Sequence, residues 1–217
     1  KGLNCGIGSS DKRKDVKKNI KLACNKLNNS YKKLILLHQI HSNKFHYIKN
    51  LSSTKDKLIG DALITKQPKI ILGILTADCA PVIIYDKKLK IISAIHAGWK
   101  GAFKGIIKKV VNYFYKMGSR PEDLIAVIGP CISEKNYEVK KDFKHKFVKK
   151  SEKNKIYFSD IKDKSYFSLN KFVYNELSES KIKNIEIINK DTYNLKNNFF
   201  SARRSTHNKE NDYGRNI

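Results

Sequence analysis

The sequence predicts a globular protein that combines short buried strands with amphipathic helices. Its 217 residues are 40% hydrophobic, and a chain of this length can bury most of its apolar surface. Short β-branched runs between turn residues, as in 70–75 and 82–85, are typical of buried strands. Residues 102–117 instead repeat apolar side chains at helical spacing, with lysines on the opposite face. We find no internal repeat, linker or second domain.

The first part of the chain is expected to contribute one helix and three strands. A helix near residues 12–28 places Cys24 on its apolar stripe, which predicts a packed thiol rather than a redox role. Strands follow over 34–40 and 45–49, and a turn containing Asp61 leads into a third strand. Asp61 is either a turn residue or a group that orients a ligand.

Segment 72–106 is the most distinctive stretch of the sequence. Two apolar runs flank a short polar step that contains Cys79, and a third run over 91–97 ends with His96. Both residues therefore lie near strand ends, where a rigid sheet can aim side chains into a cleft. A glycine-rich bend then leads into the predicted helix at 102–117. The positive N-terminal end of that helix points towards the same region and could bind an anion.

The last part of the chain alternates strands and helices and ends with clustered arginines. The predicted elements are a strand over 124–128, a helix near 140–150, a helix over 168–178, a strand over 185–188 and an aromatic strand over 198–204. Cys131 follows the first of these strands, and we interpret it as a small buried residue. Arg203 and Arg204, with Arg215 nearby, stand out because arginine is scarce in this chain.

Charge and cysteine usage exclude several classes of protein. The net charge of +25 is carried almost entirely by lysine, with only five arginines. Base readout and bidentate phosphate contacts favour arginine, so we expect no specific nucleic-acid partner. The four cysteines form no Cys-X-X-Cys pair, which favours a reducing, cytoplasmic location over a disulfide framework. No signal-peptide pattern opens the chain, and Asp78 interrupts the longest apolar stretch, so we expect no membrane partner.

Three residues at predicted strand ends, His41, Cys79 and His96, carry the candidate chemistry. One thiolate and two imidazoles suit a catalytic zinc ion with an open fourth position. The same residues would serve as a Cys nucleophile with a His base, as in thiol hydrolases and deamidases. A copper electron-transfer site is a third option, but the only methionine, Met117, lies on the core face of its helix. If a strand runs through His38 and His41, their side chains point to opposite faces, so at most one enters the cleft.

Six motifs resemble the laccase-domain proteins of the YfiH type, which are also called polyphenol-oxidase-like and are described as purine nucleoside phosphorylases. The motifs are HQIHS (38–42), GDALIT (60–65), TADCAPV (76–82), HAGWKG (96–101), IGPCI (128–132) and FFSARR (199–204). They occur in the family's order and cover almost the whole chain. The combination of TADC, HAGW and FFSxRR is highly specific.

The resemblance implies a single α+β domain over residues 1–217, with a mixed β-sheet flanked by helices, a fold also similar to the cytotoxic necrotizing factor deamidases. It implies that His41, Cys79 and His96 hold the metal, which leaves His38 as a bystander. Zinc is the expected cofactor, and copper is less favoured. The implied reactions are phosphate-dependent cleavage of adenosine, inosine, guanosine and methylthioadenosine, with adenosine deamination as a side activity. Purine nucleosides and phosphate are then the expected partners of a monomer or weak homodimer.

The remaining roles are hypotheses built on this resemblance. Arg203, Arg204 and Lys100 are candidates for phosphate binding, and Asp61 for substrate binding. Lys100 stands where the family usually has arginine, which replaces a bidentate contact with a point charge. The sequence begins at the family's LN-G segment and ends soon after Arg215, so we expect the family's N-terminal strand and last C-terminal strand to be missing. The alternative functions are a Cys–His hydrolase or deamidase, an editing factor for cell-wall precursors and, less favoured, a copper polyphenol oxidase.

Overall fold

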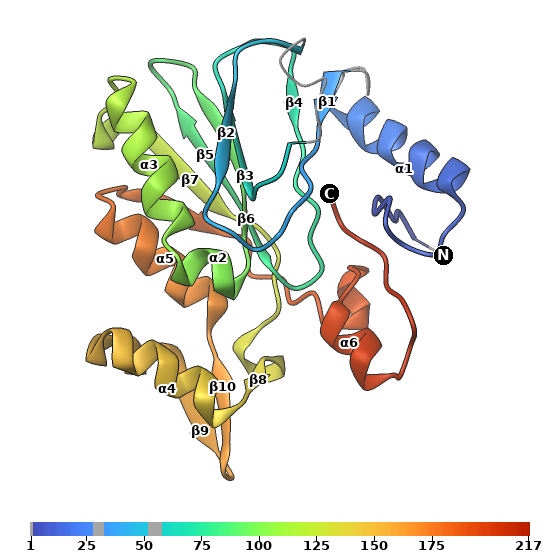
Figure 1. The fold of residues 1–217 in the computed structure, drawn as a ribbon, viewed down its shortest axis with the longest axis vertical. Helices are drawn as coiled ribbons and strands as arrows, with labels where there is room; N and C mark the ends of the chain where they lie inside the picture. The colour runs from blue at the N-terminus through green and yellow to red at the C-terminus, as the bar shows by residue number, and fades with distance from the viewer. Residues whose placement is uncertain (1, 28–32, 52–57) are drawn as a thin grey trace.

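A mixed β-sheet lies at the centre of the computed structural model, which describes residues 2–27, 33–51 and 58–217 (Figure 1). Within these residues the sheet has six strands in the order β11-β7-β5-β6-β3-β2. The strands are β2 (Phe45–Ile48), β3 (Ala62–Thr65), β5 (Ala80–Asp86), β6 (Ile92–Ala97), β7 (Leu124–Ile128) and β11 (Asn184–Ile187). The two outer pairs are parallel and the three inner pairs are antiparallel. The expected α+β class with a mixed sheet is confirmed.

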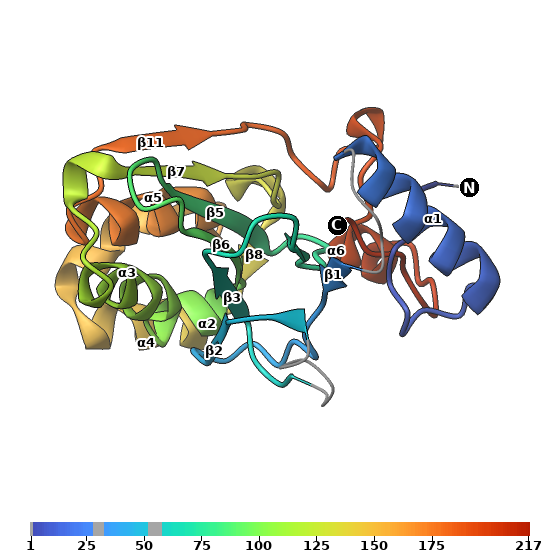
Figure 2. The same ribbon diagram turned by 90° about the horizontal axis from the view of Figure 1, so that it is seen from above.

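Helices α2 (Trp99–Phe103), α3 (Ile106–Lys116) and α5 (Leu169–Glu179) cover one face of this sheet (Figure 2). The inner face of α3 is apolar and fully buried, and it includes Ile107 and Phe114. Strand β5 alternates between buried and partly exposed side chains, as a strand with one face against helices should. Each large apolar side chain buried in this layer stabilises the fold by roughly 1.5–3 kcal/mol.

A smaller layer packs beside α2. Within the described residues it contains α4 (Lys141–Lys150) and a three-stranded sheet of β8 (Glu138–Val139), β10 (Lys164–Phe167) and β9 (Phe158–Ile161). Its core is aromatic, and the ring of Trp99 lies 4.7 Å from that of Phe143, between centroids. Trp99 therefore holds α2 in place against this cluster, next to the end of β6.

The two ends of the chain meet on the far side of the sheet from α3 (Figures 1 and 2). Helix α1 (Arg13–Lys26) packs with the parallel pair β1 (Leu34–Ile35) and β4 (Ile71–Leu72) in a separate apolar cluster. Cys24 is only 2% exposed in this cluster, as predicted for a packed thiol. Helix α6 (Ala202–His207) precedes the C-terminal segment, in which Asn216 pairs with Thr76 through both backbone hydrogen bonds.

Four short 3-10 helices complete the described elements. They are η3 (Pro121–Asp123), η4 (Glu134–Asn136), η5 (Glu152–Tyr157) and η6 (Leu195–Asn197). Across the described ranges, we find no helix with the length and apolar content needed to cross a bilayer.

Several predicted elements differ from the structure for identifiable reasons. The single helix expected over 102–117 is divided because Gly105 adopts a left-handed conformation, with φ of 80°. The aromatic strand expected over 198–204 is wrong: the Ser201 side chain accepts a hydrogen bond from the Arg204 amide and caps α6 there. The strand expected over 34–40 ends at Ile35, and the one over 70–75 contains only β4.

The first predicted helix needs only a small correction. It was expected near residues 12–28, and the structure has it from Arg13 to Lys26. Residue 28, at its expected end, lies outside the described residues.

Candidate metal centre

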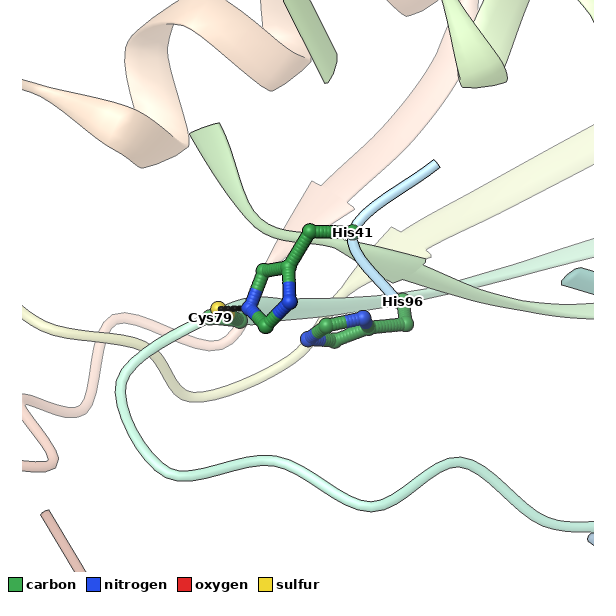
Figure 3. Close-up of side chains that lie close together, drawn as sticks. All are labelled: His41, Cys79 and His96. Carbon is green, nitrogen blue, oxygen red and sulfur yellow. Dashed lines mark hydrogen bonds between the residues drawn. The ribbon is translucent and has the colours of Figure 1, made fainter. Parts of the chain in front are cut away.

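His41, Cys79 and His96 converge where two inner strands of the central sheet, β5 and β6, begin and end (Figure 3). Their candidate ligand atoms all lie within 4.8 Å of one another, and no other such group of three is found among the described residues. His41 Nε2 lies 3.7 Å from Cys79 Sγ. The two imidazole rings meet edge to face, with centroids 4.7 Å apart. The sequence prediction that these three residues form one site thus agrees with the geometry.

Strand register explains how the site is assembled. Strands β5 and β6 are antiparallel with Ala80 opposite Ala97, so Cys79, one residue before β5, lies beside the end of β6 that carries His96. Strands β3 and β6 pair Ala62 with Ile95, which places Asp61 next to His96. The sheet therefore brings together residues that lie far apart in the sequence.

Gly98 packs directly against the side chains of Cys79 and His41. A Cβ atom at this position would lie 2.7 Å from Cys79 Sγ and 2.9 Å from His41 Cδ2. Both separations are far below ordinary contact distances, so only glycine lets the thiol and the imidazole approach each other here. The backbone of Gly98, with φ of −69° and ψ of 159°, is open to any residue.

We therefore expect Gly98→Ala to weaken metal binding, probed with zinc, by at least about tenfold, because ligands displaced by a few tenths of an ångström lose their geometry. The folded backbone accepts alanine, so the thermal midpoint of the metal-free protein should change little. Equilibrium zinc titration against a chromogenic chelator measures the effect. Gly8→Ala is the matched control, since a Cβ at Gly8 would meet nothing within 4 Å. Equal zinc affinity in both variants would contradict this account of the site.

The Asp61 carboxylate positions both histidines through hydrogen bonds, one to the backbone of His41 and one to the ring of His96. Its carboxylate is 0% exposed and accepts hydrogen bonds from the backbone N–H groups of His41 (2.9 Å) and Ser42 (2.6 Å) and from the Ser42 hydroxyl (2.7 Å). It also lies 2.8 Å from His96 Nδ1. Because an ionised carboxylate only accepts, His96 Nδ1 carries a proton, and Nε2 offers a lone pair to a metal ion once its own proton is lost. His41 itself adopts a left-handed φ of 55°, a conformation that this hydrogen-bonded loop maintains.

The surroundings of Asp61, His96 and Cys79 favour the charged form of each side chain. Burial raises the pKa of Asp61, but hydrogen bonds from His96 and Ser42 lower it to about 2. Burial likewise lowers the pKa of His96, while Cys79 and Asp61 raise it to about 9. Burial raises the pKa of the Cys79 thiol, but the charge of His96 and the hydrogen bonds with His41 and His96 lower it to about 6. Cys79 is therefore disposed to be a thiolate, the form that binds metal or acts as a nucleophile.

The donor set fits one metal ion. Two imidazoles and a thiolate at mutual distances below 4.8 Å match the ligands that zinc accepts, and three protein ligands leave a position for substrate or water. Copper accepts the same atoms, so the ligand set alone does not choose between the two metals. In the described part of the chain, this cluster offers ligands for a single centre rather than for several.

A pocket lies beside the cluster and is bordered by all three of its residues, but none of the predicted cationic residues is among those that border it. The Arg204 guanidinium donates to the carbonyls of Thr192, Tyr193 and Phe199. Arg203 donates to the carbonyl of Glu138, and the Lys100 ammonium lies 5.6 Å from the Trp99 ring centroid. Their phosphate-binding roles stay predictions that these contacts do not favour, and so does substrate binding by the buried Asp61.

His38 and His41 do not lie on opposite faces of one strand. The expected alternation would place His38 and His41 on opposite faces of a strand, but no strand runs through them. Both border the same pocket, and only His41 joins the cluster.

Sequence reasoning also missed the role of Asp78. Its carboxylate accepts hydrogen bonds from the Thr192 hydroxyl and the Arg203 amide, both at 2.7 Å, and so ties the Cys79 segment to α6. Asp78 has a left-handed φ of 83°. The available signal was its place in the TADC motif, directly before the thiol.

The sequence is similar to known proteins over most of its length. The family described as multi-copper polyphenol oxidoreductase laccase matches residues 1–217. A Rickettsia conorii protein named purine nucleoside phosphorylase is 36% identical over 190 residues, which cover 85% of this chain and 75% of the relative. A relative of the same name from Rickettsia prowazekii is 36% identical over 176 residues, or 80% of this chain and 72% of that one.

Solved structures show the same fold. The hypothetical protein YfiH of Bacillus licheniformis has a TM-score of 0.87 at 29% identity, over 98% of this chain and 83% of that one. A Neisseria meningitidis protein has a TM-score of 0.83 at 25% identity over the same shares. The chain is thus similar to these proteins over nearly its whole length.

Proposed function

Because the chain belongs to the multi-copper polyphenol oxidoreductase laccase family, which includes relatives named purine nucleoside phosphorylase, we propose that it is a zinc-dependent purine nucleoside phosphorylase. Its substrates are adenosine, inosine, guanosine and methylthioadenosine together with phosphate. Adenosine deamination is a side activity of the same site. The reaction transfers a pentosyl group, so the enzyme is a glycosyltransferase.

The observation that supports this proposal is the three-ligand cluster at the wall of a pocket. The pocket has a volume of ≈ 760 Å³ and is bordered by His41, Cys79 and His96. This volume lies within the range of about 300–1,000 Å³ that is usual for small-molecule sites. The pocket thus offers room for a nucleoside next to a coordination position that the protein leaves open.

Phosphorolysis requires one bond to break and one to form at the sugar carbon of the nucleoside. The bond from C1′ of the ribose to the purine nitrogen breaks, a bond from C1′ to a phosphate oxygen forms, and the purine leaves with the electron pair and gains a proton. A zinc ion held by the cluster would supply Lewis-acid chemistry at an oxygen ligand. His41, Cys79 and His96 would hold that ion, while Asp61 orients the His96 ring and anchors the backbone of His41.

A Cys–His hydrolase is a second candidate because one observation favours it. Cys79 has a pKa lowered to about 6, and its sulfur lies 3.7 Å from His41 Nε2. A thiolate next to an imidazole is the arrangement of thiol nucleophiles. This enzyme would act without metal and without phosphate. No described cluster of ligands supports a multi-copper oxidase.

The experiment measures purine release by protein whose zinc content is known. We expect inosine to yield hypoxanthine, and adenosine to yield adenine, only when both zinc and phosphate are present. Ammonia release from adenosine should continue without phosphate, at a lower rate. Base release that is independent of phosphate would support a hydrolase, and no release by zinc-loaded protein would reject the phosphorylase.

A further inference from the structure

Arg215 is the only arginine or lysine among the described residues that border the cluster's pocket. No aspartate or glutamate is found among those bordering residues. The other side chains that border the pocket outside the cluster carry no permanent charge. The pocket thus combines a candidate metal centre with one permanent positive charge, contributed by the C-terminal segment.

The backbone of Arg215 is held in place by the N-terminal loop. Its N–H donates to Asn4 Oδ1 at 2.8 Å, and its carbonyl accepts from the Cys5 N–H at 3.0 Å. The following residue, Asn216, forms two backbone hydrogen bonds with Thr76, at 2.8 and 2.9 Å. Arg215 is therefore anchored between the N-terminal loop and the segment that leads to Cys79. Figure 1 shows how the C-terminal segment returns to this region.

The side chain of Arg215 is also positioned. A Cβ at Gly6 would lie 2.4 Å from Arg215 Cγ, so a glycine is needed there to let the side chain pass. The guanidinium lies over the Tyr213 ring, 3.9 Å from its centroid, and donates to the Tyr213 carbonyl. Only 25% of the side chain is exposed. This arrangement orders a flexible side chain before any ligand binds.

Among the described residues, the guanidinium of Arg215 forms only one ion pair with a carboxylate, and that pair is long. Its nearest acidic partner is Asp212, at 3.9 Å, which is beyond hydrogen-bond distance. Asp212 is itself engaged by the Ser10 backbone N–H at 2.6 Å and the Ser10 hydroxyl at 2.9 Å. Arg204 differs, because three backbone carbonyls accept from its guanidinium. In the described part of the chain, only the Tyr213 carbonyl accepts a hydrogen bond from this guanidinium, so its other donors at the border of the pocket form a fork that suits a phosphoryl group.

We propose that Arg215 binds the phosphoryl group of the substrate in this pocket. The identification of that group as a co-substrate rests on the proposed function, but the binding itself does not. Such a phosphoryl group can belong to free phosphate or to the 5′-phosphate of a nucleotide. This assignment replaces Arg203 and Arg204 as the leading candidates for anion binding.

The test measures phosphate binding without any nucleoside. Zinc-loaded full-length protein is titrated with sodium phosphate at constant ionic strength, with chloride as the balancing anion, and the thermal midpoint is followed. We expect Arg215→Gln to raise the phosphate concentration for half-maximal stabilisation by about 10- to 100-fold, the usual loss for a charge-assisted hydrogen bond. Arg215→Lys keeps the charge without the fork and should show an intermediate loss. Arg120→Gln, which removes an equal charge at an exposed site before β7, should match the wild type.

A parallel titration with AMP and adenosine distinguishes the two sources. A loss of AMP affinity with unchanged phosphate affinity assigns Arg215 to a nucleotide 5′-phosphate, and a loss of both assigns it to phosphoryl groups in general. Unchanged affinity for both ligands in Arg215→Gln and Arg215→Lys would overturn the proposal, as would a wild type that binds neither. If Arg215→Gln fails to fold, Arg215→Lys decides the question. Arg215-dependent phosphate binding by a protein that cleaves no nucleoside would reject the proposed function and leave this inference standing.

Discussion

Asp61→Ala is expected to destabilise the protein by about 3 kcal/mol or more and to weaken zinc binding by about 10- to 100-fold. The substitution removes the acceptor of the His41 and Ser42 N–H groups, the Ser42 hydroxyl and His96 Nδ1. Each buried donor left without a partner costs about 1–3 kcal/mol. The left-handed backbone of His41 then loses the contacts that maintain it. His96 also loses the acceptor that fixes its tautomer, so both imidazoles become poorer ligands.

Chemical denaturation of the metal-free protein measures the stability loss, and chelator competition measures the zinc affinity. Ser42→Ala is the graded control, because it removes only the hydroxyl bond and should cost about 1 kcal/mol. The pH dependence gives an independent check. Since the folded pKa of Asp61 is lowered to about 2, its contribution is present above the ordinary pKa of aspartate, about 3.9, and is lost as the pH falls towards 2. An Asp61→Ala variant with wild-type stability and zinc affinity would show that the carboxylate is only a turn residue.

The part of the site on the central strands could be predicted because local pattern determines it. The β-branched runs that form β5 and β6 end where turn residues begin, so Cys79 and His96 could be placed at strand ends from the sequence alone. Antiparallel pairing of these neighbouring strands then brings the two residues together. Local information and tertiary structure agree in this segment.

The position of His41 could not be obtained in the same way. Its loop is shaped by the Asp61 carboxylate, 20 residues later in the chain, which accepts from its backbone N–H. Periodicity cannot detect such a contact, and the apolar run before it suggested a longer strand than β1. The same limit applies to Arg215, whose position depends on Asn4 at the opposite end of the chain. Residues held by distant polar contacts were therefore missed or misplaced, whereas those on buried strands were not.

Cys79→Ser is expected to abolish phosphate-dependent base release and to lower zinc affinity by more than the roughly 10- to 100-fold that is usual for an outer-shell partner. The hydroxyl is nearly isosteric but does not ionise at neutral pH, so a metal ligand and a candidate nucleophile are lost together. Cys131→Ser is the matched control: that thiol is buried, its pKa is raised to about 12 by burial and by nearby negative charge, and it lies outside the cluster. It should retain zinc and activity.

Histidine variants and alkylation experiments distinguish the two possible roles of Cys79, metal ligand and nucleophile. If the thiolate is a metal ligand, His41→Ala and His96→Ala should also lose zinc, and bound zinc should protect Cys79 from iodoacetamide. Metal-free protein should then be alkylated at Cys79 first, because the pKa of its thiol is lowered to about 6 whereas burial raises those of Cys5 and Cys131. A nucleophile in a metal-independent hydrolase gives the opposite pattern, in which chelation leaves activity intact and alkylation removes it. Full activity after chelation, combined with loss on alkylation, would therefore replace the zinc phosphorylase by the thiol enzyme.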